Sequence, residues 1–600
     1  MKLKCFEVMH GRYIMLMCIA SYASLLGGYL SPAYGILFFI MLTIILFLWF
    51  SSAIKIKKDV LLVLVFSLYA VASTLWAKDK WASIMFSSSL LSGALFYLIL
   101  RNCEGWEDSM LSVLVFWGVI NAALGVFQAA GNTPQGFFYN PNTYSGFLTP
   151  LIPLSLYLYW KHRKAYLIWA ASFLIFSNLL STSRAGIFSM ALSLLIISYF
   201  FLKNKERKML IGLVIGGFIA LAFYIIFPYI LDLFITTPQD SFSPIKATLE
   251  KGTKSIVQKY YQYQDTLKLF LKEPLFGHGI NSYLGITETV SNPYFQKIQA
   301  HTHNIFLNIL VELGLTGFIF FALFAAIILK KSLLSTNYFF KAALFAYFVH
   351  NLVEYNFPPP PFQVIFFVLA ALTMKEKEDE VLTTTIGGWM KKAANYLILI
   401  YFFVLIAPQY IGFIYYEKAK KTIEKQDIDR TYKNLLYAST FSYAVSMVQE
   451  SMADFLSHIH MSSKEKNIEL QQDREKYYLK ALHLNSVNSG LYIGIAKYYY
   501  NTGKPLLSER YLVRAAGLFP YNQSLRIEMA NLYKATGRFA ESIKLLIDVD
   551  KFLTKYAPLD PLRIPACLKL AECYRAQGDL SLYQKYIEKA EQINRLIAVK

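Results

Sequence analysis

Long apolar runs, separated by short polar stretches, recur through the first two thirds of this 600-residue chain. Each run is long enough to cross about 30 Å of hydrocarbon as a helix. The thirteen runs lie at 12–30, 33–52, 59–77, 83–100, 110–130, 141–160, 165–181, 184–202, 209–229, 303–329, 336–355, 361–374 and 394–416. No small-residue cleavage site precedes the second run, so we interpret the first as a membrane span rather than a secretion signal. The pattern predicts an all-α, polytopic membrane protein with about 12–13 transmembrane helices.

A second pattern, a repeat, occupies the C-terminal part of the chain. The motif Ala-x-x-Tyr-x-x-x-Gly starts at Ala496, recurs 34 residues later at Ala530, and returns 41 residues after that at Ala571. Small residues expected on the second helix of each pair lie at Ala481, Ala515 and, after an insertion of seven residues, Ala590. A period of 34 with these features is typical of tetratricopeptide repeats (TPR). We therefore predict a TPR-like helical solenoid that follows a degenerate helical lead-in at 418–487, and stacked repeats of this kind form a binding groove.

The charge distribution divides the chain at the same place. Apolar residues make up 56% of the chain and charged residues 16%, against about 25% charged residues in ordinary globular proteins. Residues 1–416 contain 50 of the 98 charged side chains, and residues 417–600 contain the other 48. This composition excludes a disordered chain and a cytosolic multidomain enzyme, and no nucleic-acid partner is expected. We predict a transmembrane domain at 1–416 and a repeat domain at 417–600.

Basic residues are concentrated in alternate short loops. If the N-terminus is cytoplasmic, the loops on that side hold about 20 Lys and Arg residues, and the short loops opposite hold only Lys78, Lys80 and Arg184. The positive-inside rule therefore favours a cytoplasmic N-terminus and, after thirteen spans, an extracytoplasmic 417–600. The polar connection at 230–302 and the turn at 354–361 are expected on the same outer side. The five cysteines form no CxxC pair and no disulfide-framework spacing, so we assign them no chemistry.

Two polar motifs at the expected outer side stand at the ends of apolar runs. His303-Asn304, followed after nine residues by Gly314-Leu315-Thr316-Gly317, opens the tenth run. The small residues at the two glycine positions would let a neighbouring helix approach closely, and a helix cap with an interfacial polar pair is the simpler alternative. Ser183-Arg184-Ala185-Gly186 opens the eighth run. An arginine at an outer helix end runs against the positive-inside bias, which favours a functional role for Arg184 over a snorkelling anchor.

Two further motifs are weaker when taken alone. The stretch from Pro274 to Tyr283 lies in the outer connection and contains Gly277 and Gly279, which permit a tight backbone turn. Asn140-Pro141-Asn142 precedes the sixth run, where a turn or a helix cap is the default interpretation of Asn142.

Together, and in this order, the four motifs resemble those of the O-antigen ligase (Wzy-C) superfamily of polytopic glycan transferases. The resemblance covers about residues 1–375. One position departs from the family pattern, in which an arginine before an aromatic residue stands roughly fifteen residues ahead of the Pro-x-x-Gly turn. Here Lys259, followed by Tyr260, occupies that place. A lysine keeps the charge but loses the bidentate fork of a guanidinium.

The resemblance implies transfer of a preassembled glycan from a polyprenyl (undecaprenyl) diphosphate to an acceptor hydroxyl. The reaction would take place at the outer face of a bacterial cytoplasmic (inner) membrane. Arg184 and Lys259 would bind the diphosphate, His303 would accept the hydroxyl proton, and Asn304 would orient the imidazole or a sugar hydroxyl. Supporting residues would be Gly277, Gly279, Tyr283, Gly314, Gly317 and Asn142. Because diphosphate is already a good leaving group, no cofactor or metal is expected.

The acceptor and one other function class remain open at this point. The superfamily includes ligases that use a lipid A core sugar, polymerases that use another repeat unit, and protein O-oligosaccharyltransferases that use Ser or Thr. A TPR groove outside the cell slightly favours a protein or another large acceptor as a partner. A transporter or flippase of lipid-linked sugars is the alternative of another class. A flippase would need cationic side chains along an inner cavity, whereas the candidates here cluster on one side.

Overall fold

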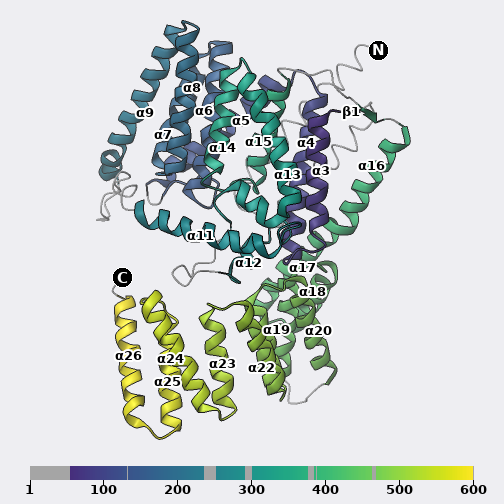
Figure 1. Ribbon diagram of the computed structural model, residues 1–600, viewed down its shortest axis with the longest axis vertical. Helices are drawn as coiled ribbons and strands as arrows, with labels where there is room; N and C mark the ends of the chain where they lie inside the picture. The colour runs from purple at the N-terminus through teal and green to yellow at the C-terminus, as the bar shows by residue number, and fades with distance from the viewer. Residues whose placement is uncertain are drawn as a thin grey trace.

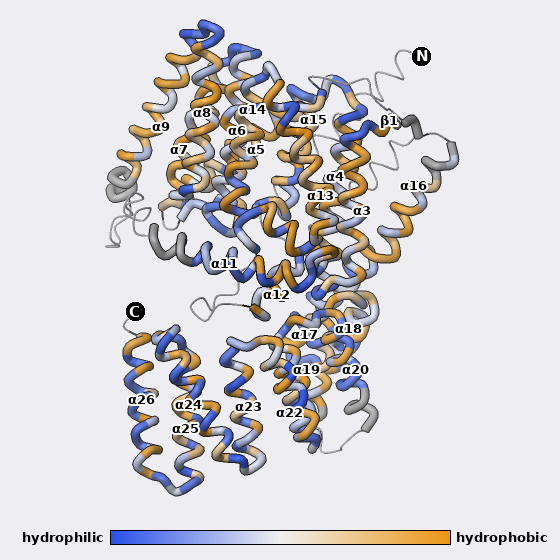
Figure 2. Tube along the Cα trace, viewed as in Figure 1, coloured by the Kyte–Doolittle hydropathy of each residue, from blue (hydrophilic) through white to orange (hydrophobic). Residues whose placement is uncertain are grey.

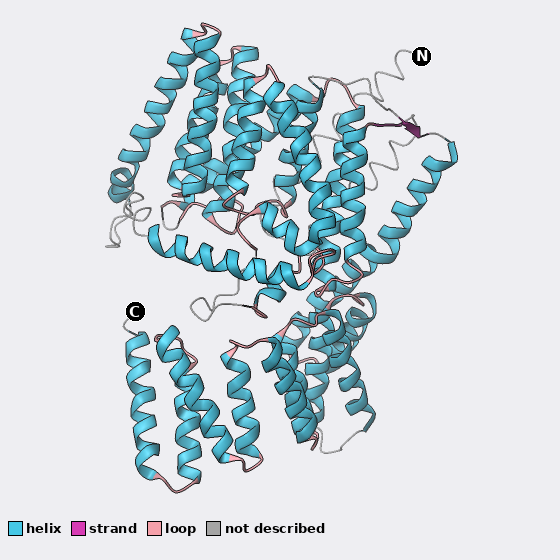
Figure 3. Cartoon of the chain, in the orientation of Figure 1, coloured by secondary structure: helices cyan, strands magenta, loops and turns pink. Residues whose placement is uncertain are grey.

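The computed structural model describes residues 54–130, 133–234, 252–290, 301–375, 384–386, 388–462 and 468–598. The first two predicted spans, 12–30 and 33–52, lie outside the described residues. The described chain is almost entirely helical, with a bundle of long helices above and a row of shorter helix pairs below (Figure 1, Figure 3). The strands within it are β1 (Ile54–Ile56) and β2 (Thr384–Ile386), which pair antiparallel and were not expected from the sequence.

Helices occupy all eleven predicted spans that fall within the described residues. They are α3 (Lys58–Ser73), α4 (Lys80–Asn102), α5 (Glu107–Gln128), α6 (Pro141–His162), α7 (Ala165–Leu180), α8 (Arg184–Lys203), α9 (Arg207–Phe234), α13 (Ile305–Leu334), α14 (Tyr338–Asn351), α15 (Pro360–Lys375), and the consecutive α16 (Gly388–Tyr401), π-helix η1 (Phe402–Ile406) and α17 (Ala407–Glu424). Within the described part, six helical segments are long and apolar enough to cross a membrane. They are Lys80–Asn102, Glu107–Gln128, Arg184–Lys203, Arg207–Phe227, Ile305–Leu334 and Tyr396–Glu424. Figure 2 shows apolar stretches along these helices, and the prediction of an all-α polytopic membrane protein is confirmed.

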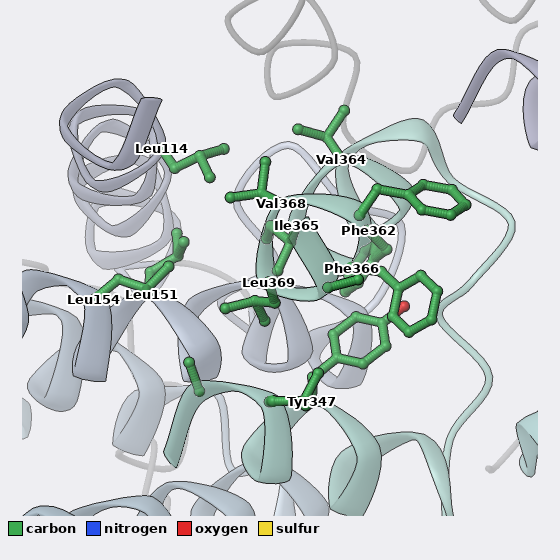
Figure 4. Close-up of a cluster of buried hydrophobic side chains, with 14 of the residues drawn as sticks. Leu114, Leu151, Leu154, Tyr347, Phe362, Val364, Ile365, Phe366, Val368 and Leu369 are labelled. Carbon is green, nitrogen blue, oxygen red and sulfur yellow. The ribbon is translucent and has the colours of Figure 1, made fainter. Parts of the chain in front are cut away.

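The core of the bundle lies around α15, in which every residue from Pro360 to Met374 is buried. A helix that is apolar all round belongs inside a larger assembly of helices. Phe366 packs against Tyr347 of α14 and Phe357, with ring centroids 5.5 Å apart in each pair. Side chains from α5 and α6 approach the same helix from another side (Figure 4). This central position fixes the turn before α15, which carries part of the site described below.

The tenth predicted span is interrupted, which corrects the expectation of one continuous helix. Gly314, inside α13, has φ 64° and ψ −171°, a conformation that is essentially restricted to glycine. The loop before α12 fills the break, because the amides of Leu315 and Thr316 donate to the carbonyls of Pro274 and Leu275, at 2.8 and 3.2 Å. Backbone groups that the break leaves without helical partners are thereby satisfied, as a buried segment requires.

The reason for the glycines also differs from the one expected. A Cβ at Gly314 would lie 2.4 Å from the Leu275 carbonyl oxygen, and one at Gly277 would lie 2.4 Å from the Glu312 carbonyl oxygen. The close approach at Gly314 is therefore made by a loop and not by a neighbouring helix. At Gly317 a neighbouring helix does approach, because the ring of Tyr69 on α3 would lie 3.0 Å from the added atom.

The outer connection contains two helices, α11 (Gly252–Lys272) and α12 (Tyr283–Thr287). Both lie at the end of the bundle that faces the repeat helices (Figure 1). Helix α17 runs through Tyr416, so the predicted change of composition falls inside a helix rather than in a linker. The division into domains at this residue stays a prediction.

The C-terminal part is a series of helices paired as the repeat predicts. After α17 come α18 (Ile428–Phe441), α19 (Ser446–Ser462), α20 (Ile468–Leu484), α21 (Ser489–Asn501), α22 (Pro505–Leu518), α23 (Gln523–Ala535), α24 (Phe539–Tyr556), α25 (Arg563–Ala576) and α26 (Leu580–Ala598). The motif glycines Gly503, Gly537 and Gly578 stand at the turns between paired helices with φ of 77°, 77° and 83°. Ala496 and Ala515 are buried where α21 and α22 touch. The TPR-like solenoid is confirmed.

Candidate functional site

The site is organised around a buried carboxylate, Glu354, which is 5% exposed. The ring nitrogen Nδ1 of His303 lies 2.7 Å from its Oε2. The amide of Asn142 donates to its Oε1 at 2.9 Å, and the ammonium of Lys259 lies 3.3 Å from the same oxygen. These four side chains come from four separate segments: the turn before α13, the turn after α14, the first turn of α6, and α11. The structure thus brings together three residues that the sequence singled out, around a fourth that it did not.

Local sequence explains why Glu354 lies in a turn. Helix α14 ends at Asn351, and the following proline run cannot continue a helix. The amide of Glu354 donates to the carbonyl of His350 at 3.0 Å, and the side chain of Asn351 accepts from the amide of Asn356 at 3.0 Å. These bonds hold the turn closed, with its carboxylate pointing toward His303.

His303 occupies an unusual backbone conformation, with φ 55°. Residues other than glycine adopt this left-handed region uncommonly, and where they do, the neighbouring structure must hold them there. Here the hydroxyl of Thr302 donates to the carbonyl of Asn304 at 2.7 Å, and the amide of Thr302 donates to Asn308 Oδ1 at 3.0 Å. The side chain of His303 is 23% exposed, so its ring can be reached from outside while Nδ1 contacts the buried carboxylate.

The charges at the site decide which nitrogen of His303 carries the proton. Burial alone would raise the pKa of Glu354, but the hydrogen bond and charge of His303, with the charge of Lys259, outweigh it and lower that pKa to about 2. An ionised carboxylate can only accept hydrogen bonds, so Nδ1 of His303 is the donor and Nε2 is the acceptor nitrogen in the neutral ring. Burial lowers the pKa of the neighbouring His301 to about 3, so that ring is uncharged at neutral pH.

Asn304 acts on the geometry of the site through the backbone. Its Oδ1 accepts from the amides of Phe306 and Leu307, at 2.9 and 3.0 Å, which caps α13. Its Nδ2 donates to the carbonyl of Leu352 at 3.0 Å. Asn304 therefore joins the turn that carries His303 to the turn that carries Glu354, a positioning role that agrees with the simpler interpretation of the motif.

Arg184 is the first residue of α8, and its side chain is exposed. Ser183 caps this helix, because its hydroxyl accepts from the amide of Gly186 at 3.3 Å. The helix start packs directly on α6, since a Cβ at Gly186 would lie 1.5 Å from the hydroxyl of Ser145, three residues beyond Asn142. Arg184 thus stands on the helix end that abuts the first turns of α6. The partial positive charge of that helix N-terminus adds to the charge of the guanidinium.

Three of the supporting residues, Gly277, Gly279 and Tyr283, lie in the segment that follows α11 and contacts α13. Gly277 and Gly279 shape the loop that fills the break in α13, and Gly279 packs against Ala77, which would lie 2.4 Å from an added Cβ. The hydroxyl of Tyr283 shares a 2.8 Å hydrogen bond with Thr266 on α11, and its amide donates to Glu312 Oε1 at 3.2 Å.

Two residues of the site were missed by sequence reasoning. Glu354 lies 51 residues after His303 in a turn that the sequence marks chiefly by its prolines, and its one signal is an acidic side chain beside an apolar run. Gln262 of α11 donates to the carbonyl of His301 at 2.5 Å, which only the folded chain reveals. Across the residues that the structure describes, no group of three or more His, Cys, Asp or Glu side chains is placed to hold a metal ion.

Comparisons with known proteins give one family match and several solved structures of low overall similarity. Residues 168–322 match the family described as O-antigen ligase, whereas no curated protein matches the chain. Among solved structures, the chain is similar to MamA from Desulfovibrio magneticus, with 10% identity over 31% of this chain and 95% of that one and a TM-score of 0.25. It is also similar to YrrB, a TPR protein with an unusual peptide-binding site, with 16% identity over 31% of this chain and 88% of that one and a TM-score of 0.23. It is also similar to PilF from Pseudomonas aeruginosa, with 12% identity over 31% of this chain and 77% of that one and a TM-score of 0.24.

The family match includes three of the four motifs: the stretch at 183–186, the turn at 274–279, and the signature from His303 to Gly317. Asn142 and Glu354 lie outside the matched range although they contact residues inside the site. The resemblance is confirmed to this extent: residues 168–322 match the O-antigen ligase family, and the chain is a multi-pass membrane protein whose C-terminal part is a TPR-like solenoid.

Proposed function

We propose that this protein transfers a preassembled glycan from a polyprenyl diphosphate to an acceptor hydroxyl at the outer face of a bacterial cytoplasmic membrane. The observation that carries the proposal is the hydrogen bond between His303 and the ionised Glu354. A histidine held in one tautomer by a buried carboxylate is well suited to general-base catalysis at a hydroxyl. The repeat domain, residues 417–600, stands on the same outer side in this proposal.

In the reaction, Nε2 of His303 accepts the proton of the acceptor hydroxyl while its oxygen attacks the anomeric carbon of the donor sugar. The bond from that carbon to the diphosphate oxygen breaks, and the electron pair leaves with the polyprenyl diphosphate. Glu354 stabilises the imidazolium that forms, since its charge lies 2.7 Å from Nδ1. The imidazolium then releases its proton to water or to the departing diphosphate.

The departing diphosphate needs cationic partners for its growing charge. Arg184, at the positive end of α8, is the principal candidate. Lys259 has a double role, because its ammonium contacts the carbonyl of Val353 at 2.5 Å and Glu354 at 3.3 Å. An ammonium carries three N–H donors, so the two contacts with described residues leave a third for a phosphate oxygen. Lys259 would thereby connect donor binding to the carboxylate that orients His303.

The acceptor is a lipid A core sugar, a second repeat unit, or a Ser or Thr of an exported protein. A hollow between α21, α22 and α23 favours a large acceptor or a protein partner, because it offers both apolar and charged side chains. Its lining includes Ile493, Lys497, Tyr500, Leu512 and Glu528. The hollow lies in the repeat domain, so a partner bound there would also be held near the outer face in this proposal.

Reconstitution in liposomes tests the proposal, with a lipid-linked glycan as donor and the three acceptor types supplied separately. We expect transfer to one acceptor type by the wild-type protein, and loss of transfer in His303→Ala with unchanged membrane insertion. His162→Ala is the matched control, since His162 stands at the opposite end of α6 from Asn142. Normal transfer by His303→Ala would remove the mechanism, and movement of the donor across the bilayer without transfer would favour a flippase.

A further inference from the structure

The repeat helices contact the transmembrane part at several places, and one of these contacts is made by the docking turn, residues 485–489, between α20 and α21. The amide of Ser486 donates to the carbonyl of Lys78 at 3.2 Å, and the side chain of Asn485 donates to Asp79 Oδ2 at 2.9 Å. The hydroxyl of Ser489 donates to both oxygens of Glu288, at 3.0 and 3.1 Å. Asn522 of the next repeat also donates to Glu288. Polar contacts thus surround the turn on both sides.

An apolar side chain occupies the centre of this contact. Val487 is buried together with Leu269, Tyr283, Ile286 and Val311, which belong to α11, α12 and α13. The fit is close, because a Cβ added to a glycine in α12, Gly285, would lie 2.6 Å from Val487 Cγ2. The packing around Val487 leaves no room for one more methyl group. Such packing fixes the position of the docking turn on α12, which a flexible linker between two domains would not do.

One face of α11 connects this contact to the candidate site. Lys259, Gln262, Thr266 and Leu269 are spaced by three, four and three residues, which places them on one side of a helix. Lys259 contacts Glu354, Gln262 holds the carbonyl of His301, Thr266 bonds Tyr283, and Leu269 packs with Val487. Ten residues of helix span about 15 Å. The docking turn therefore contacts α11 near its C-terminal end, and Lys259, which contacts the carboxylate of the site, lies ten residues earlier on the same helix.

We propose that the docking turn is a positioning element of the active site, with Val487 as its principal residue. It holds α11 and α12 so that Lys259 and the His301 carbonyl keep their distances to Glu354 and to the turn of His303. The repeat domain thus has a second role besides binding a partner, since it completes the support of the diphosphate-binding lysine. This inference rests on the proposed function for its effect on transfer, but the contact itself is testable without it.

A pair of complementary substitutions tests the contact. Gly285→Ala places a methyl group against Val487, and Val487→Ala removes Cγ2, the atom with which that methyl group would clash. We expect Gly285→Ala to slow transfer by about tenfold or more, since small displacements at catalytic groups are costly, and to raise the donor KM while the acceptor KM is unchanged. The double variant Gly285→Ala/Val487→Ala should recover to within about threefold of wild type. Gly517→Ala is the control, because a Cβ at Gly517 meets nothing within 4 Å.

Full transfer by Gly285→Ala, or no recovery in the double variant, would overturn the proposal. A rise in the acceptor KM alone would also overturn it, since the repeats would then act only in recruitment. A second measurement is independent of transfer: Asp79 and Asn485 are directly paired across the contact, so Asp79→Cys/Asn485→Cys should form a disulfide in the folded protein. Failure to form it would refute the contact. Formation in a protein whose wild type transfers no glycan would refute the proposed function alone.

Discussion

Replacing Glu354 by Gln should test two effects of its carboxylate: the tautomer that it imposes on His303, and the pH-dependent stability that it gives the fold. The substitution keeps the size of the side chain but leaves one accepting oxygen where there were two. Asn142 and Lys259 both donate to the same side of the carboxylate, so the glutamine oxygen is expected to stay with them. Its NH₂ group then faces His303 and donates to Nδ1, which moves the ring proton to Nε2. In that tautomer His303 cannot accept the acceptor proton, and we expect transfer to fall by about 10²–10⁴-fold.

The same substitution changes how stability depends on pH. In the native protein the pKa of Glu354 is lowered from 4.5 to about 2. A lowered carboxyl pKa stabilises the fold fully above the ordinary pKa, and this contribution is lost as the pH falls toward the native value. At about 1.4 kcal/mol for each pKa unit, the contribution near pH 7 is about 3 kcal/mol, and about 1 kcal/mol of it remains at pH 3. The stability difference between wild type and variant should therefore shrink by about 2 kcal/mol between pH 7 and pH 3.

Two measurements check the prediction: the initial transfer rate in liposomes, and unfolding in detergent micelles at pH 7, 4 and 3. Glu107→Gln is the control, because Glu107 pairs with Lys375 at 2.7 Å at the far end of α15 from Glu354. If Glu354→Gln transfers glycan at the wild-type rate, His303 does not need the carboxylate to hold its tautomer, and the assignment is refuted. A stability difference that is constant from pH 7 to pH 3 would show that His303 and Lys259 do not lower the pKa of Glu354.

Three further substitutions test the proposed diphosphate-binding residue Arg184, the interruption in α13 and the turns between repeat helices. Arg184→Lys should lose most transfer, because one ammonium cannot bridge two phosphate oxygens as a guanidinium does; full activity would reduce Arg184 to an anchor. Gly314→Ala should lower the free energy of unfolding by about 2–4 kcal/mol, measured in detergent, because its φ of 64° and the 2.4 Å approach of Leu275 both exclude a side chain. Gly537→Ala should cost only about 1–2 kcal/mol, since the strain at φ 77° is its sole penalty and a Cβ there meets nothing; Gly517→Ala, in a helix, should instead be neutral or stabilising.

The sequence predicted the helices well because apolar periodicity and repeat spacing are local properties of the chain. All eleven predicted spans within the described residues are helical, and the glycine at position 537 has the left-handed conformation that the repeat motif implies. What it could not predict is the interruption at Gly314. The break depends on a loop some 40 residues earlier in the chain, whose carbonyls replace the missing helical partners. Hydropathy averages over such a break and reports one span.

The site was only partly predictable for a similar reason. His303 and Arg184 were visible because each is a polar or charged residue at the end of an apolar run, and Lys259 was visible because it occupies the place of an arginine in the family pattern. Glu354 carries the same kind of signal, but four prolines in succession follow it, two in the turn and two at the start of α15, and the prolines alone explain a turn. Its importance follows from the three donors that converge on it, and convergence is a property of the tertiary structure.

The contacts of Glu354 also account for the lysine that stands where the family has an arginine. Beside a buried carboxylate that already accepts from Asn142 and His303, a bidentate guanidinium would occupy both carboxylate oxygens and compete with the imidazole for one of them. A single ammonium at Lys259 contacts one oxygen and leaves the other to His303. If Lys259 binds a diphosphate as we propose, the loss of the fork weakens that contact but leaves Nδ1 of His303 paired with the carboxylate. More of the diphosphate charge would then be neutralised by Arg184 in the proposed function.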